Sequence, residues 1–126
     1  MNVVDSSAWL EYFADGPNAD FFAGAIEATG ELLVPAVVVY EVFRRVLQQR
    51  GEDAALQAAA LLQQGRLVEL TAPLALTAAR LGLQHRLPLA DSIIYATTLA
   101  SDATLWTQDG DFEGLPHVRY TAKGGK

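Results

Sequence analysis

Four acidic residues stand where the sequence changes from strand-like to helix-like, and this placement is unusual for a purely structural role. Each lies beside apolar residues, although Asp and Glu are rarely buried unless they are paired. Carboxylates that meet at one point repel one another unless a proton or a cation intervenes. Hard divalent cations such as Mg2+ prefer oxygen ligands of this kind, so the sequence predicts a metal site. The four acids are Asp5, Glu41, Asp91 and Asp109.

Three of these acids also have an ordinary structural interpretation. Asp5 could cap the helix that follows it. Asp91 comes three residues after a proline, where a negative charge favours the start of a helix. Asp109 and Asp111 flank Gly110 and could simply form a turn. The joint placement of the acids, rather than any one of them, therefore supports the metal hypothesis.

Glu41 is harder to explain by structure alone. On a helix it would lie beside Val37 and Val38, where an unpaired carboxylate is costly. An ion pair with Arg44 or Arg45 is the structural alternative. The net charge of −6 is unusual for a nucleic-acid-binding protein, although a local basic rim could still contact phosphates. The residues available for such a rim are Arg44, Arg45, Arg80, Arg86, Arg119 and Lys123.

The composition is that of one ordinary globular domain. The chain has 126 residues, of which 51% are hydrophobic and 19% charged, and it contains no cysteine for disulfides or thiolate metal sites. We expect a single domain over residues 1–122 and a frayed tail at 123–126. No secretory signal or membrane-spanning run is apparent, so a cytoplasmic location is expected.

Hydrophobic periodicity and helix-breaking residues predict alternating strands and helices. Pro35 favours a helix over the following valines, because proline suits a helix start but disrupts a central strand. Ser6 or Ser7 is expected to cap the first helix. The expected strands are 1–4, 32–34, 67–70, 104–107 and 118–120, and the expected helices are 8–13, 19–28, 36–49, 52–64, 75–83 and 89–100.

This alternation predicts an α/β fold with a mostly parallel sheet covered on both faces. Sites in such sheets form outside the carboxyl ends of the strands. Asp5 and Asp109 directly follow strands, while Glu41 and Asp91 lie early in helices, so all four can face one edge of the sheet.

The aromatic residues of the first three helices form a second candidate feature. Most of them should be core, and any that remain on the surface would mark a groove for a partner. The predicted groove residues are Trp9, Phe13, Phe22, Tyr40 and Phe43.

The ordered motifs of the chain resemble those of a PIN domain, and the resemblance spans residues 3–112. It resembles in particular the VapC-type toxins of bacterial and archaeal toxin–antitoxin pairs. The motifs are Val4-Asp5-Ser6-Ser7-Ala8-Trp9, Pro35 with Glu41 six residues on, Pro88-Leu89-Ala90-Asp91-Ser92-Ile93-Ile94-Tyr95-Ala96 and Leu105-Trp106-Thr107-Gln108-Asp109-Gly110-Asp111-Phe112.

The resemblance implies a PIN-like three-layer fold with a central sheet of four to five strands. It implies an endoribonuclease dependent on Mg2+ or Mn2+, a homodimer, and a VapB-like antitoxin that blocks the acidic pocket. By the same resemblance Asp5, Glu41, Asp91 and Asp109 form the acidic quartet. Ser6 and Thr107 would support the quartet, and Asp111 is either a fifth acid or a turn residue.

Without cysteine or a well-placed histidine, activation of water by a metal is the favoured route to RNA cleavage. We expect Asp5 and Asp91 to hold the principal Mg2+, Asp109 to help hold a second ion or its waters, and Glu41 to orient or deprotonate the attacking water. Such hydrolysis leaves a 5′-phosphate and a 3′-hydroxyl. Another Mg2+-dependent phosphohydrolase and a non-catalytic interaction module are the alternative functions.

Overall fold

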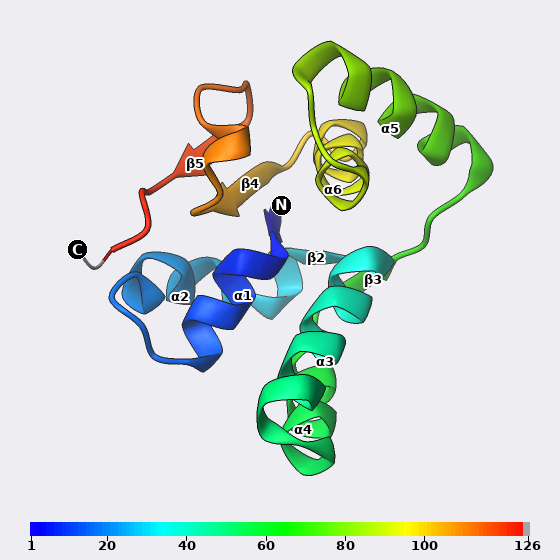
Figure 1. The fold of residues 1–126 in the computed structure, drawn as a ribbon. Coiled ribbons are helices and arrows are strands. Elements are labelled where there is room, and N and C mark those ends of the chain that lie inside the picture. Colours follow the sequence, from blue (N-terminus) through cyan, green and yellow to red (C-terminus); the bar gives the residue numbers. More distant parts are fainter. Residues whose placement is uncertain (125–126) are drawn as a thin grey trace.

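The apolar runs of the sequence form a five-stranded parallel sheet in the computed structural model, which describes residues 1–124 (Figure 1). The strand order is β3-β2-β1-β4-β5, and neighbouring strands all run in the same direction. This confirms the predicted α/β class and the parallel sheet. The strands are β1 Asn2–Val4, β2 Leu32–Pro35, β3 Arg66–Val68, β4 Thr104–Thr107 and β5 Val118–Tyr120.

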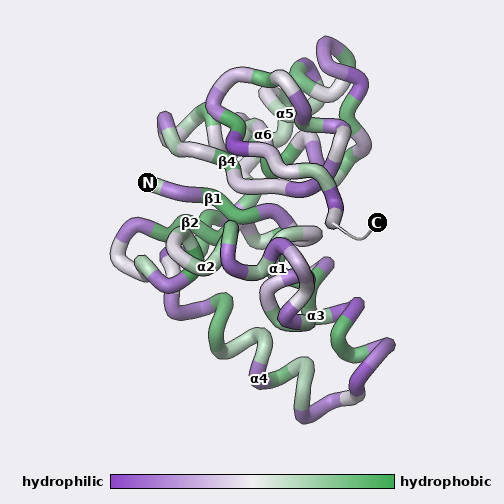
Figure 2. Tube along the Cα trace, turned by 90° about the vertical axis from the view of Figure 1, so that its left-hand side faces the viewer, coloured by the Kyte–Doolittle hydropathy of each residue, from purple (hydrophilic) through white to green (hydrophobic). Residues whose placement is uncertain are grey.

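Helices cover both faces of this sheet and complete three layers. Figure 2 shows α5 and α6 on one side of the strands and α1 to α4 on the other. α6 packs directly on β1, β2 and β4, and α5 lies against α6. The helices are α1 Ser6–Phe13, α2 Ala19–Glu27, α3 Ala36–Arg50, α4 Glu52–Leu62, α5 Ala72–His85 and α6 Leu89–Ala100, with short 3-10 turns η1 Thr29–Glu31 and η2 Gly110–Phe112.

The chain reverses its direction across the sheet next to β1. From β1 it proceeds outward to β2 and β3, and then returns through α5 and α6 to β4 on the other side of β1. Ligand sites of open parallel sheets form at such a reversal, outside the carboxyl ends of the strands. The ends of β1 and β4 therefore define where a site is expected, and Asp5 and Asp109 follow these ends.

Several ends of elements differ by one to three residues from those expected, and the cap of α1 is not the expected serine. Asp5, and neither serine after it, caps α1, because its carboxylate accepts a hydrogen bond from the backbone N–H of Ala8. The third strand begins one residue earlier than expected and ends at Val68. Pro35 does end β2 and directly precede α3 as predicted, so the valines after it are helical.

Burial separates the aromatic residues into two groups. Trp9 and Phe22 are 1% and 0% exposed and belong to the core, so they offer no surface to a partner. Phe13 and Phe43 are partly buried against that core, while Tyr40 is 64% exposed. The surface part of the predicted groove is thus limited to Phe13, Tyr40 and Phe43.

Within residues 1–124, no helix has the length and apolar character needed to span a membrane. Of the predicted tail, Lys123 and Gly124 are exposed and belong to no helix or strand. Residues 125 and 126 lie outside the described part of the chain.

Candidate active site

Asp5 is a buried carboxylate held by three donors. It follows β1 and is 2% exposed. Its Oδ1 accepts hydrogen bonds from the Ser7 hydroxyl at 2.9 Å and the Ala8 N–H at 3.0 Å, and its Oδ2 accepts one from the Thr107 hydroxyl at 2.7 Å. Burial outweighs these hydrogen bonds and raises the pKa of Asp5 to about 6. The fold therefore fixes a carboxylate where its charge is costly.

Thr107 links the carboxyl ends of β1 and β4. Its hydroxyl donates to Asp5 and accepts a hydrogen bond of 2.9 Å from the backbone N–H of Asp109. The Asp109 carboxylate in turn accepts from the N–H of Asp111 at 2.9 Å, which starts the turn η2. This chain of hydrogen bonds orders the loop after β4 and turns the Asp109 side chain toward the site.

Glu41 reaches the site from α3. The Ser6 hydroxyl at the start of α1 donates a hydrogen bond of 2.6 Å to Glu41 Oε1. Within residues 1–124, neither Arg44 nor Arg45 forms an ion pair with it, although both lie close by on the same helix. The ion-pair interpretation of Glu41 is therefore wrong, and its carboxylate remains available at the site.

Asp91 lies in the first turn of α6, three residues after Pro88, which caps the helix. Burial raises the pKa of Asp91 to about 8, with further contributions from the negative charges of Asp109, Asp5, Asp111 and Glu41, in that order. The helix N-terminus favours a negative charge, so burial and the repulsion among the acids together outweigh that preference. Four other carboxylates thus lie near enough to Asp91 to disfavour its charged form.

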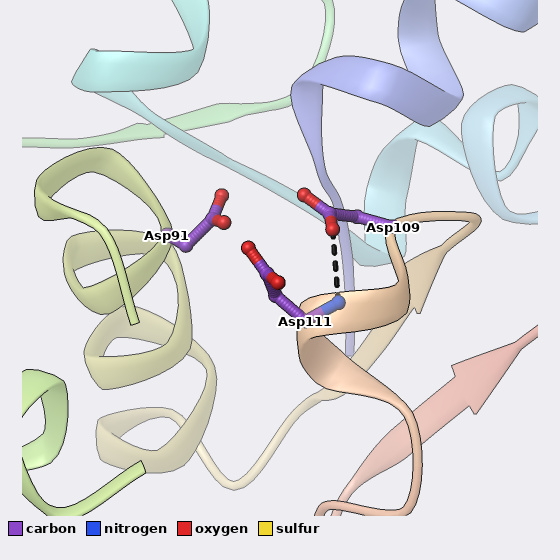
Figure 3. Close-up of side chains that lie close together, drawn as sticks. All are labelled: Asp91, Asp109 and Asp111. Carbon is purple, nitrogen blue, oxygen red and sulfur yellow. Dashed lines mark hydrogen bonds between the residues drawn. The ribbon is translucent and has the colours of Figure 1, made fainter. Parts of the chain in front are cut away.

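Three carboxylates approach one another most closely. Oxygen atoms of Asp91, Asp109 and Asp111 all lie within 4.8 Å of one another. Figure 3 shows the Asp91 and Asp111 side chains directed toward each other from α6 and η2, with Asp109 beside them. Oxygen donors in such a group suit Mg2+ or Mn2+, and a cation there would relieve the repulsion that raises the Asp91 pKa. The residues present therefore fit the predicted metal.

A cavity of about 430 Å³ opens at this edge of the sheet. The four predicted catalytic acids Asp5, Glu41, Asp91 and Asp109 all line it, and Asp111 does not. The other residues lining the cavity are Ser6, Ser7, Leu10, Tyr40, Arg44, Arg45 and Gln48. The sequence thus predicted residues that the fold brings together, although they are far apart along the chain.

The structure also assigns contacts that the sequence did not reveal. Ser7 supports Asp5, whereas Ser6 supports Glu41. Gln108 is buried and donates a hydrogen bond of 3.4 Å to the Ser7 carbonyl, while it accepts one of 2.9 Å from Asn18. Its position directly before Asp109 was the only available signal. The histidines do not join the acids, because neither lines the cavity.

The sequence model of the PIN domain matches residues 3–118. This chain belongs to the PIN domain family. The predicted resemblance to PIN domains is therefore confirmed over most of the chain.

Solved structures share this fold at low sequence identity. A toxin–antitoxin complex from Klebsiella pneumoniae matches with a TM-score of 0.78 and 22% identity, covering 94% of this chain and 96% of the other. VapC20 of Mycobacterium tuberculosis, a sarcin–ricin-loop-cleaving toxin, matches with a TM-score of 0.76 and 22% identity, covering 94% of this chain and 99% of the other. VapBC2 of Rickettsia felis, bound to a promoter DNA fragment, matches with a TM-score of 0.71 and 13% identity, covering 96% of this chain and 97% of the other. A comparison with curated proteins gave no match.

Proposed function

We propose that this protein is a divalent-cation-dependent endoribonuclease and the toxin of a toxin–antitoxin pair. The observation that carries the proposal is the convergence of Asp5, Glu41, Asp91 and Asp109 on one cavity, with Asp111 beside them. Membership of the PIN domain family supports a nuclease, and toxins with this fold support the toxin role. An RNA substrate implies a cytoplasmic location.

Asp91, Asp109 and Asp111 would hold Mg2+ or Mn2+, because their oxygens form the closest group. The sequence predicted Asp5 and Asp91 as the holders of the principal ion; Asp5 lines the cavity together with Asp91 and Asp109, and would complete this ligand set. A bound divalent cation supplies water activation and stabilises negative charge on the phosphate. Ser6 holds the Glu41 carboxylate in position to orient the attacking water and accept its proton.

Attack of water on phosphorus breaks the bond to the 3′ oxygen, so the products carry a 5′-phosphate and a 3′-hydroxyl. Incubation of labelled RNA with the protein and Mg2+ or Mn2+, followed by analysis of the new ends, tests this assignment. A primary product with a 2′,3′-cyclic phosphate contradicts it, because that end requires attack by the ribose hydroxyl. Uncut RNA with hydrolysis of small phosphoesters favours another phosphohydrolase, and no hydrolysis of either favours a non-catalytic module.

A VapB-like antitoxin is proposed to bind an apolar cavity on α1, α3 and α4. This cavity has a volume of about 180 Å³ and includes Phe13 of the predicted groove, together with Val46, Ala58 and Leu61. An Arg side chain of the antitoxin would also be attracted to the acidic cavity. Leu61 is partly exposed there, so Leu61→Asp should weaken co-purification with the product of the neighbouring gene. Unchanged capture of that partner would reject this surface.

The proposed homodimer is supported by apolar side chains on α5 and at the start of α6. Leu76, Leu83 and Leu89 are 62%, 87% and 79% exposed, and leaving such side chains in water forgoes the free energy of their burial. Sedimentation analysis of wild-type protein and of Leu83→Lys tests this proposal. A wild-type protein that remains monomeric at all concentrations contradicts it.

A further inference from the structure

The face that α3 presents to the acidic cavity is fixed by its buried stripe. Val38, Val42 and Val46 recur every four residues and are buried. Tyr40, Arg44 and Gln48 recur with the same spacing on another face of the helix and line the cavity. Burial of the valines therefore holds this second row, together with Arg45, along one wall of the site.

Among residues 1–124, no carboxylate forms an ion pair with either of the two arginines of this wall. In this part of the chain, an ion pair joins His117 and Asp102 at 3.8 Å, and neither arginine takes part in one. The nearby acids Glu41 and Asp5 are instead held by hydroxyl groups. Arg44 and Arg45 are exposed, so both guanidinium groups are free to bind an anion at the edge of the acidic cavity.

Tyr40 adds an aromatic surface to the same wall. It is 64% exposed although it lines the cavity, so its ring is not needed for the core. Within residues 1–124 it stacks on no other aromatic ring. Leu10, which is half-buried, contributes an apolar side chain to the same cavity. Aromatic faces beside basic groups are the combination that binds unpaired nucleotides.

We propose that this wall of α3 is the RNA-binding edge of the site, an inference that rests on the proposed ribonuclease function. Arg44 and Arg45 bind phosphates on either side of the cleaved one, and Tyr40 stacks on an unpaired base. Phosphate contacts position a strand without reading its sequence, and the acidic cavity repels phosphates without such cations. Because duplex bases already stack on one another, the substrate is a single-stranded segment or a loop.

The test measures binding of a single-stranded oligoribonucleotide in a Glu41→Gln background, with Mg2+ present. This variant retains the aspartates that are proposed to hold the cation. Tyr40→Ala should weaken binding about tenfold, as loss of one base stack does, while Tyr40→Phe should retain affinity. The double variant Arg44→Ala with Arg45→Ala should reduce the slope of log affinity against log salt by about 1.4, the value for two single-strand phosphate contacts.

Arg66→Ala is the matched control, because Arg66 is exposed at the start of β3 and does not line the cavity. It should leave both the affinity and the salt slope close to those of the background protein. In the active enzyme, Tyr40→Ala should raise KM and leave kcat nearly unchanged, since the lost contact is made equally with substrate and transition state. Melting curves confirm that the exposed substitutions do not unfold the protein.

Equal binding by all of these variants, with RNA still cleaved by the wild type, overturns this inference but leaves the proposed function intact. Loss of antitoxin binding with unchanged RNA binding also overturns it and assigns the wall to a protein partner. Wild-type protein that never cuts RNA rejects the ribonuclease proposal. If the Tyr40 and arginine variants nevertheless weaken RNA binding in that case, the result still supports an RNA-binding edge.

Discussion

Asp5 shows how a single residue can serve both the fold and the site. Its carboxylate caps α1, yet three hydrogen bonds do not prevent burial from raising its pKa to about 6. Asparagine caps helices about as well as aspartate, so capping alone does not require the charge. The charge is instead useful where a cation or an ordered water must be held. Thr107 is the partner that joins this carboxylate to the loop of Asp109.

The Thr107→Val substitution tests this connection at the scale of one hydroxyl group. Valine is similar in size but neither donates to Asp5 nor accepts from Asp109, so a buried carboxylate and a partly buried N–H each lose a partner. We expect the free energy of unfolding to fall by about 1–3 kcal/mol and RNA cleavage to fall strongly. Thr107→Ser keeps the hydroxyl and should retain most of the stability and most of the RNA cleavage of the wild type. Equal behaviour of the two variants in urea unfolding and cleavage would contradict this role.

At the scale of elements, the sequence predicted the helices and strands better than their ends. α6 and β4 have the predicted bounds, because Pro88 ends the preceding segment and Thr104 to Thr107 combine β-branched and aromatic residues that favour a strand. The capping of α1 was not predictable in the same way. Asp5, Ser6 and Ser7 are all good caps, and Asp5 also accepts a hydrogen bond from Thr107, which is distant in sequence.

Two substitutions of Asp5 separate its capping role from its charge. Asp5→Asn can still accept a hydrogen bond from the Ala8 N–H, so metal-free stability should remain close to that of the wild type. Asp5→Ala loses the cap and should cost about 1 kcal/mol. RNA cleavage should be lost in both variants, because both lack the carboxylate. Melting temperatures in chelator, measured beside cleavage rates, decide this; an active Asp5→Asn enzyme would assign Asp5 to the scaffold alone.

At the scale of the whole molecule, the parallel topology predicted where the acids would meet. The chain reverses next to β1, so residues following β1 and β4 must lie at one edge. Which aromatic side chains are buried and which are exposed was not predictable, because burial depends on how the helices pack against one another. Trp9 is buried in the core, whereas Tyr40 is exposed where α3 lines the acidic cavity. Residue type and local spacing do not distinguish these two cases.

The pH dependence of stability is a property of the whole acidic cluster. The pKa values of Asp5 and Asp91 are raised to about 6 and about 8, so the metal-free native state holds protons that the unfolded chain has released. Stability should therefore fall as pH rises from about 4 to about 8. Urea unfolding in the presence of a chelator, repeated between about pH 4 and about pH 8, measures this change in the free energy of unfolding. Asp20→Asn, a change to an exposed acid on α2, is the control and should leave the slope unchanged.

A bound cation should oppose this loss of stability. Ionised carboxylates bind Mg2+ better than protonated ones, so the stabilisation by Mg2+ should increase over the same pH range. A metal-free stability that rises between pH 4 and 8, or an effect of Mg2+ that does not depend on pH, would contradict the assignment of the cluster.

The most direct test of the metal site is the melting temperature of wild type and Asp91→Asn at pH 8.5, with and without Mg2+. Without metal, Asp91→Asn should melt at or above the wild type, because one member of a mutually repelling group becomes neutral. Mg2+ should raise the melting temperature of the wild type more than that of the variant, since binding to the native state adds stability. A variant that melts well below the wild type without metal, and gains as much from Mg2+, would show that Asp91 belongs to the scaffold and not to a metal site.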